Sequence, residues 1–318
     1  MSTSVKDKGA IDLPFAIYDA FTSTPYSGSQ GASILNASDI PPQMRPLIAK
    51  EIGAPATAFV DMCTENQIKV QFFSTVAELP MCGHGTVCLI TRLVDAGLLA
   101  CPETGIAEAI LNLPKGSATV EFGRNAESRV EVMLDVSPAT FTGSNLDMER
   151  LAFLLGVTVE DFSTDFPAEV ASADFIHLCL PMRGLAAMAR LKPNMDALAQ
   201  FCRENGLETI ATFSTEVQQP GRTVHVRDFC PAVGVAESAA AGTTNAALAT
   251  YLLRKGIVLP GANGDVLVQA EQGMELGRPS HVTTRITLRD SEIERLQVGG
   301  VASRVIDGKL QVLLGGES

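Results

Sequence analysis

The sequence predicts an α+β protein built from two similar halves, and three observations support this prediction. The chain has 318 residues, about the length of two domains. Short strand-like runs outnumber helical segments in both halves. The same order of strand, glycine-containing loop and apolar helix occurs twice, at an offset of 159 positions. We therefore expect two related domains.

In the first half, a strand-like run is followed by a helical pattern that ends at Gly53. Residues 81–86, with the sequence Met-Cys-Gly-His-Gly-Thr, form a loop before a strongly apolar helix over residues 87–96. The predicted elements of this half are a loose tail over 1–11, strands over 13–21, 57–62, 68–73, 107–113, 118–122 and 129–134, and a helix over 40–52.

The second half repeats this order. Residues 240–244, with the sequence Ala-Ala-Gly-Thr-Thr, precede an apolar helix over 245–255 that stops at Gly256. The other predicted elements are strands over 172–180, 208–214, 222–229, 282–288 and 310–314, and helices over 147–155 and 195–205.

The evidence for the repeat is two pairs of matching glycines. The offset places Gly83 over Gly242 and the helix-ending Gly97 over Gly256, with no gap between them. The alternative is a chance match between two strand–loop–helix units, which are common in proteins. The ungapped match of both glycine pairs favours a duplication.

Composition excludes several classes of partner and cofactor. The formal net charge of −12 disfavours binding to nucleic acid and to anionic membranes. Seven cysteines occur in an odd number and without a Cys-x-x-Cys pair, which argues against a disulfide framework and a structural zinc site. We expect no metal and no cofactor, and a small-molecule substrate as the partner.

The expected location is the cytoplasm. Residues 1–10 are polar and lack the apolar segment of a secretory signal. No apolar run of about 18 residues predicts a membrane-spanning helix. The lack of a predicted disulfide framework fits a reducing compartment.

Each repeated loop is suited to an anion. Gly83, Gly85 and Gly242 allow a ligand to approach the backbone closely. The N–H groups and partial positive charge of a helix N-terminus attract a carboxylate. These termini would also stabilise negative charge that develops when a proton leaves an adjacent carbon.

Cys82 and His84 are the candidate bases in the first loop. A thiol at a helix N-terminus can have a lowered pKa, which would make Cys82 a usable base. Histidine moves protons near neutral pH, so His84 is a second candidate. The structural alternatives are a buried, inert cysteine and a packed or capping histidine.

Glu78 and Glu237 precede the two loops by the same spacing. Either carboxylate could hold an amine or act as an acid–base partner, or could simply be solvated. Thr243 could bind a substrate carboxylate or cap its helix. His177, His225 and His281 lie in strands and are expected to be structural, whereas Arg222, Arg227 and Arg278 are candidate partners for a carboxylate.

At these residues the sequence resembles the PhzF-like family of phenazine biosynthesis proteins, which has the diaminopimelate epimerase and proline racemase fold. The resemblance covers about residues 13–316. Its segments are Ile-Tyr-Asp-Ala-Phe-Thr at 17–22, Pro-Tyr-Ser-Gly at 25–28, the helix and strand at 48–60, the first loop at 73–86, the second at 234–243, Gly-Arg-Pro-Ser at 277–280 and Val-Gly-Gly at 298–300.

The resemblance implies two pseudo-symmetric domains, each a β-barrel-like sheet around a central helix, with the active site between them. We expect an N-terminal domain over 12–130, to which strands at about 297–316 return, and a C-terminal domain over 131–296. Dimers are common in this kind of fold, so a homodimer is one candidate, and the oligomeric state stays open. Family activities begin with proton removal and need neither metal nor coenzyme.

Four positions depart from the family pattern. Ala56 stands where family isomerases have a catalytic glutamate, and Ser238, beside Glu237, stands in place of an aspartate. Ala241 replaces the second cysteine of two-base epimerases. Ser29 lies in a motif that usually reads Gly-Asn-Pro. The family's glutamate mechanism and a two-thiol racemisation therefore cannot operate unchanged.

These considerations predict a one-base isomerase that moves a proton on a small carboxylate-bearing substrate. The alternatives are a lyase that eliminates water on the same scaffold and a non-catalytic binding protein. The candidate catalytic residues are Cys82, His84 and Glu237. The candidate substrate-binding residues are Gly83, Gly85, Thr86, Ser238, Gly242, Thr243, Ser29 and Glu78.

Overall fold

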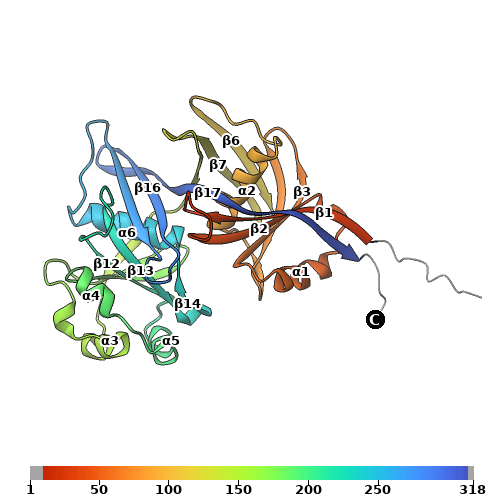
Figure 1. Cartoon of the computed structure of the whole chain (residues 1–318). Helices are drawn as coiled ribbons and strands as arrows, with labels where there is room; N and C mark the ends of the chain where they lie inside the picture. The colour runs from red at the N-terminus through yellow and green to blue at the C-terminus, as the bar shows by residue number, and fades with distance from the viewer. Residues whose placement is uncertain (1–9, 314–318) are drawn as a thin grey trace, which may run out of the picture. The chain divides into compact units, whose positions relative to one another are not determined.

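The computed structural model of the chain describes residues 10–313, which form two compact units (Figure 1). Of these residues, the first unit contains 10–26, 30–132 and 301–313, and the second contains 27–29 and 133–300. Positions 1–9 of the predicted tail lie outside the described residues. So do position 314 of the predicted final strand and positions 314–316 of the segment predicted to return to the N-terminal domain. The prediction of a tail is wrong for Ala10 and Ile11, which already belong to the first strand.

The first unit is a curved sheet with two helices. Its strands are β1 (Ala10–Ala20), β2 (Ser29–Leu35), β3 (Ala56–Cys63), β4 (Gln67–Phe73), β5 (Glu78–Leu79), β6 (Ile106–Leu113), β7 (Gly116–Arg124) and the start of β8 (Val130–Asp135). Its helices are α1 (Arg45–Ile52) and α2 (Gly83–Asp95), with 3₁₀ turns at Ala37–Asp39 and Pro42–Met44.

The second unit repeats this plan with more helices. Its strands are β9 (Thr140–Gly143), β10 (Glu169–Ser172), β11 (Ile176–Pro181), β12 (Thr209–Ser214), β13 (Val224–Cys230), β14 (Val235–Ser238), β15 (Asp265–Gln272) and β16 (Ser280–Arg289). Its helices are α3 (Met148–Leu155), α4 (Leu185–Arg190), α5 (Met195–Glu204) and α6 (Gly242–Arg254), with 3₁₀ turns at Val159–Asp161 and Pro231–Val233. The long strand β17 (Glu292–Leu313) pairs with β16 through its first part and with β1 through its second.

Strand pairing confirms the duplication predicted from the sequence. In the first unit β2–β3 is parallel, β3–β4 and β4–β5 are antiparallel, and β4–β6 is parallel. In the second unit the same sequence of pairings joins β11–β12, β12–β13, β13–β14 and β13–β15. Each unit therefore has the same topology around its glycine-led helix.

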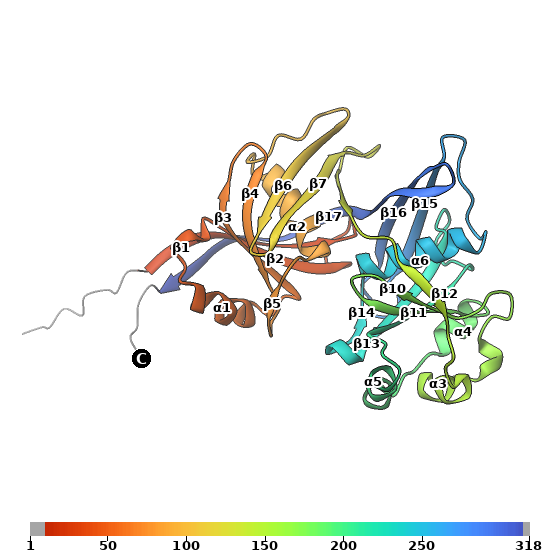
Figure 2. The same ribbon diagram turned by 180° about the vertical axis from the view of Figure 1, so that it is seen from behind.

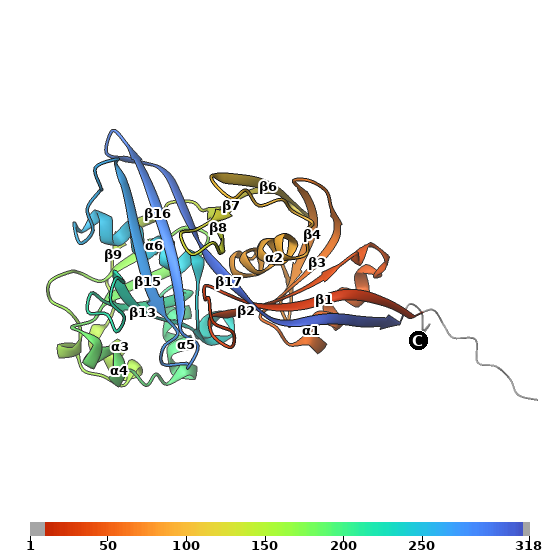
Figure 3. The same ribbon diagram turned by 45° about the horizontal axis from the view of Figure 1, so that its top comes forward.

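The two glycine-led helices are the most buried helices of their units. Helix α2 is buried from Gly85 to Leu93, and Figure 3 shows it enclosed by the strands of the first unit. Helix α6 is buried from Thr244 to Leu252 and covers one face of the second sheet, whereas α3, α4 and α5 cover the other (Figure 2). No helix within residues 10–313 combines the length and apolar character needed to cross a membrane.

Apolar side chains explain the outer layer of each unit. In the first, Ala49 of α1 packs with Ile34, Phe59 and Phe73 of the sheet. In the second, a larger cluster that includes Leu151, Met188, Phe201 and Phe229 joins α3, α4 and α5 to the strands. Burial of aliphatic and aromatic area, at about 25 cal/mol per Å², holds these layers together.

Several sequence predictions of element bounds are wrong. The helix predicted over 40–52 begins only at Arg45, because Pro41 and Pro42 hold the preceding residues in a 3₁₀ turn. Helices α2 and α6 begin at Gly83 and Gly242, so the supposed loop glycines lie in the first helical turn. The sequence pattern does not predict strands β2, β5, β9, β14 and β15 or helix α4. The strand predicted over 172–180 is in fact two strands, β10 and β11, which are separated at 173–175.

Replacing Gly273 with alanine is expected to lower the free energy of unfolding by about 2–5 kcal/mol. Gly273 has a φ of +76°, and an added Cβ would lie 2.5 Å from the carbonyl oxygen of Arg278 and 2.7 Å from that of Ala239. Urea unfolding of the two proteins measures the difference.

Gly277→Ala is the matched control, since this glycine lies in the same turn with a φ of +65° and open space around its Cβ position. Its expected loss is about 1 kcal/mol, from backbone strain alone. Equal losses in the two variants would contradict the close contact at Gly273.

Candidate functional site

The first candidate site is the N-terminal turn of α2. Cys82 is the N-cap in an extended conformation, with φ −144° and ψ 110°, and no side chain caps the helix. The first intrahelical bond runs from the Thr86 N–H to the Cys82 carbonyl, at 2.9 Å. The N–H groups before Thr86 have no intrahelical acceptor and are suited to bind an anion.

The structure brings Cys82 and His84 together at this turn. The Cys82 Sγ lies 3.5 Å from Nδ1 and 3.8 Å from Nε2 of His84. Cys82 is buried, whereas His84 as a residue is partly exposed. His84 is therefore the member of the pair that a ligand can reach.

Burial makes both members of the pair neutral at pH 7. It raises the pKa of the Cys82 thiol to about 12, against a hydrogen bond from the Gly85 backbone that lowers it. It lowers the pKa of His84 to about 4. This is the opposite of the thiol shift expected from the sequence, because desolvation of the thiolate outweighs the helix N-terminus. The imidazole is then the available base, and the thiol stays protonated.

Three further predicted residues belong to this turn. A Cβ on Gly85 would lie 3.2 Å from both the Cys82 Sγ and the Phe72 ring, so glycine allows their close packing. Gly83 has open space at its Cβ position. Thr86 is fully buried, and its hydroxyl has no hydrogen-bond partner within residues 10–313. A substrate contact at Thr86 stays a prediction.

Ala56 starts β3 and is fully buried next to Gly31 of β2, its parallel partner. The methyl group cannot transfer a proton, so the acid–base role implied for this position has no counterpart there. The following Thr57 is also fully buried.

The second candidate site is the N-terminal turn of α6. Ala241 is its N-cap with φ −128° and ψ 113°, close to the values of Cys82. Gly242 and Thr243 are partly exposed in the first turn. The backbone geometry of the anion site is therefore repeated, but the thiol and imidazole are absent.

The two symmetric carboxylates occupy equivalent places with different partners. Glu78 pairs across the strands with Phe73, and Glu237 pairs with Phe229. Glu78 is exposed and accepts a hydrogen bond from Gln71 at 3.3 Å. This first carboxylate is free to meet a ligand.

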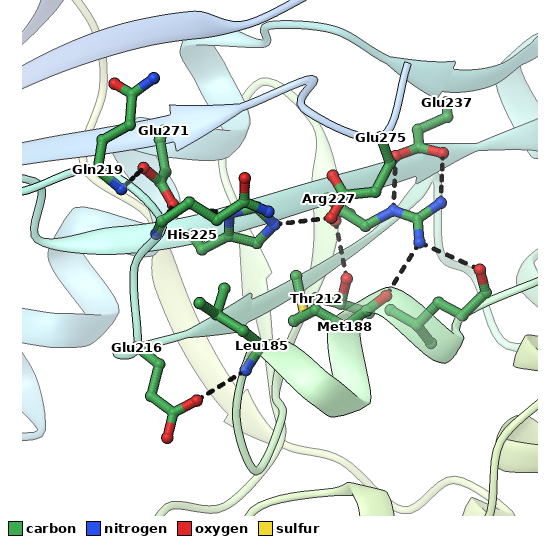
Figure 4. Close-up of polar contacts among 12 residues, drawn as sticks. Leu185, Met188, Thr212, Glu216, Gln219, His225, Arg227, Glu237, Glu271 and Glu275 are labelled. Atoms are coloured by element: carbon green, nitrogen blue, oxygen red, sulfur yellow. Dashed lines mark hydrogen bonds and ion pairs between the residues drawn. The ribbon is translucent and has the colours of Figure 1, made fainter. Parts of the chain in front are cut away.

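Glu237 is bound by Arg227 in a bidentate pair, shown in Figure 4. Both N–H···O distances are 2.8 Å, and both side chains are less than one-tenth exposed. Arg227 also donates to the carbonyl oxygens of Met188 and Leu191, at 3.0 and 3.1 Å. The geometry gives Glu237 a structural partner, and an acid–base role for it stays a prediction.

The segment before α6 is held by the β15–β16 hairpin. Gln272 donates to the carbonyl oxygen of Ser238 at 2.8 Å, and Ser280 donates to that of Ala239 at 2.7 Å. Ser29 and its neighbour Gly28 lie in the same unit, where the Gly28 N–H bonds the Pro279 carbonyl oxygen at 3.1 Å. Substrate contacts at Ser29 and Ser238 stay predictions.

The three arginines predicted to bind a carboxylate, Arg222, Arg227 and Arg278, all form hydrogen bonds with other residues of the chain. Arg222 bonds Gln269 at 3.0 Å, and Arg278 donates to the carbonyl oxygens of Ser27 and Gly28 at 2.8 Å. Together with Arg227 they hold segments of the second unit in place.

The sequence did not reveal a buried network around His225. Its Nδ1 and Nε2 lie 2.8 and 2.9 Å from Glu271 and Glu275, and Glu271 also accepts the backbone N–H groups of Gln218 and Gln219 (Figure 4). Burial by itself lowers the pKa of His225, but the hydrogen bonds and charges of both glutamates raise it overall. Glu271 and Glu275 lie about 50 positions from His225 in the sequence, so no local sequence pattern indicates these contacts.

The network predicts a loss of stability as the pH rises above about 6.5. Because the folded-state pKa of His225 is raised, its contribution is fully present below the unfolded value of about 6.5 and disappears as the pH rises through the folded value. Urea unfolding at several pH values should show a decline that His225→Asn removes.

His281→Asn is the control for this slope. The pKa of His281 is lowered, chiefly by burial, so its contribution changes at lower pH and in the opposite direction. An unchanged alkaline decline in His225→Asn would contradict the assignment.

Comparison with known proteins identifies a family and several similar isomerases. The chain matches the model of the phenazine biosynthesis-like protein family over residues 18–308. It is 27% identical to an isomerase of Escherichia coli (strain K12), YddE, over 89% of this chain and 93% of that protein. It is 29% identical to the trans-2,3-dihydro-3-hydroxyanthranilate isomerase of Pseudomonas chlororaphis, over 90% of this chain and 95% of that protein.

The fold is shared with solved structures. A PhzF-family phenazine biosynthesis protein of Bacillus anthracis superposes with a TM-score of 0.84 at 24% identity, covering 96% of this chain and 100% of that one. The predicted α+β fold is thereby confirmed.

Proposed function

The chain belongs to the phenazine biosynthesis-like family of isomerases, and from this premise we propose that it moves a proton on a carbon of a small carboxylate-bearing substrate without a cofactor. The observation that carries the proposal is the Cys82–His84 pair at the N-terminal turn of α2, where His84 is partly exposed. A base and an anion site adjoin each other there.

In the proposed reaction, His84 removes a proton from a carbon that is conjugated with the substrate carboxylate. The imidazole becomes an imidazolium, and the electrons of the broken C–H bond move into the conjugated system. N–H groups of the first turn of α2 stabilise the negative charge that develops on the carboxylate. The imidazolium exchanges its N–H proton with solvent and then protonates another carbon, so that the double bond shifts and nothing is oxidised.

Cys82 supports this cycle as a neutral thiol. With a pKa of about 12 the thiol stays protonated at pH 7, and its sulfur can accept a hydrogen bond from one imidazole N–H, which leaves the lone pair of the other ring nitrogen free to take the proton. One base then serves both transfers, which accords with alanines at positions 56 and 241. The first turn of α6 offers a similar anion site in the second unit.

The test is mass spectrometry in heavy water. The protein is incubated with trans-2,3-dihydro-3-hydroxyanthranilate, the compound in the name of the Pseudomonas relative, and with small amino and hydroxy acids. Uptake of one deuterium at carbon, with the rest of the mass unchanged, supports the isomerase. Loss of water would identify a lyase. Binding without any exchange would mean that the protein only binds its ligand.

A further inference from the structure

A buried polar cluster lies beneath the first turn of α6. The Thr244 hydroxyl, on the third residue of the helix, donates to Oδ2 of Asp228 on β13 at 2.9 Å. It also lies 3.5 Å from Nδ1 of His177 on β11, which in turn lies 2.8 Å from the hydroxyl of Thr209 on β12. Asp228, Thr244 and His177 are each only 1% exposed.

The first unit shows that the fold does not require this carboxyl group. The positions equivalent to Asp228 and Thr244 are Phe72 on β4 and Gly85 in the first turn of α2, which pack closely against each other without polar groups. The second unit therefore has a carboxyl–hydroxyl hydrogen bond where the first has an apolar contact. Because burying a carboxyl group is costly, its presence needs an explanation other than packing.

The carboxyl group is incompletely bonded. Its Oδ1 has no hydrogen-bond partner within the described part of the chain. Burial raises the pKa of Asp228 to about 6, with hydrogen bonds involving Thr244, Cys230 and Thr209 lowering it and the charge of Glu237 raising it. The group therefore changes charge close to neutral pH.

No cation in the cluster balances this charge. Burial lowers the pKa of His177 to about 4, so its imidazole is neutral above that pH, and its Nε2 has no partner within residues 10–313. Glu237, on the neighbouring strand, is already paired with Arg227. The N-terminus of α6 is thus the positive group that the Asp228 carboxylate faces.

We propose that Asp228 is a positioning residue, which holds the first turn of α6 through Thr244 and takes up a proton from solvent when an anion binds at that turn. The inference rests on the proposed function, because it treats this turn as an anion site. A carboxylate beneath the turn and an anion above it would share one helix N-terminus and repel each other. Protonation of Asp228 removes the repulsion.

The first experiment needs no ligand. Amide signals of Gly242, Thr243 and Thr244 are followed by NMR from about pH 5 to pH 8, a range that spans the Asp228 titration. In the wild-type protein they should shift together with a midpoint near pH 6. Asp228→Asn should abolish that midpoint, and Thr244→Val, which removes a hydrogen bond that favours the carboxylate, should raise it. Asp174→Asn, in an exposed turn of the same unit, should leave it unchanged.

The second experiment uses anthranilate as the anion and measures its binding by calorimetry in two buffers of different ionisation enthalpy. The wild-type protein should take up a proton on binding and lose affinity by up to about tenfold per pH unit above pH 6. Asp228→Asn should bind without that proton and with little pH dependence.

The outcomes separate the inference from the proposed function. Absence of the amide titration overturns the inference, whatever the protein catalyses. Binding of anthranilate with equal proton uptake in wild type and Asp228→Asn overturns it as well. Failure of anthranilate to bind, together with an intact amide titration, would count against the proposed substrate class and leave the positioning role supported.

Discussion

Replacing His84 with glutamine is expected to slow deuterium transfer to the substrate by about 10²–10⁴-fold. Glutamine keeps a polar side chain at the first turn of α2 but cannot accept and return a proton. The neutral imidazole, with its pKa near 4, is the only group of the Cys82–His84 pair that is both unprotonated at pH 7 and partly exposed. The measurement is the initial rate of deuterium uptake by mass spectrometry.

The partner variant Cys82→Ser gives a smaller expected effect. Serine keeps a hydrogen-bond acceptor for the imidazole N–H, so the reduction should be about tenfold or less. Cys63→Ser, which changes a partly exposed thiol of the same unit, should leave the rate unchanged. If Cys82→Ser abolished exchange and His84→Gln did not, the thiol would be the base and the assignment of roles would have to be reversed.

Replacing Glu237 with glutamine is expected to lower the free energy of unfolding by about 3–5 kcal/mol. The change leaves the Arg227 guanidinium buried without its counter-charge, and the Met188 and Leu191 carbonyl oxygens cannot replace a carboxylate. The double variant Arg227→Met with Glu237→Gln removes both charges and should lose less than the single variant. Urea unfolding measures all three proteins.

Glu78→Gln is the matched control in the first unit. This exposed carboxylate occupies the equivalent place and should change stability by no more than about 0.5 kcal/mol. The predicted acid–base role of Glu237 is tested separately, by measuring activity well below the melting temperature. If the folded Glu237→Gln variant keeps its rate of deuterium transfer, the residue is structural; if the rate falls a hundredfold, Glu237 takes part in proton transfer.

Local features of the sequence were sufficient to predict much of the fold. The offset that relates Gly83 to Gly242 predicted the duplication, and the two units share one strand topology. Gly97 and Gly256, at φ +69°, lie directly after the ends of their helices, as predicted. Glycine at helix ends and hydrophobic periodicity act over a few neighbouring residues, so one sequence displays them directly.

Helix starts were harder to predict than helix ends. The residues from Gly83 to Thr86 have low or moderate helix propensity, so the sequence predicts a loop there. They are helical because burial of α2 inside its sheet stabilises the first turn as well. Tertiary packing outweighed local propensity at this point.

The sequence by itself determined the two-fold plan, the glycine-led helices and the proximity of Cys82 to His84, because each depends on residues that are close along the chain. Only the tertiary structure decided the protonation of that pair, since burial sets the pKa values of both groups. It also decided the partner of Glu237 and placed Asp228 beneath α6. Those contacts join different strands and helices, and their energies depend on the water that folding removes from around each charge.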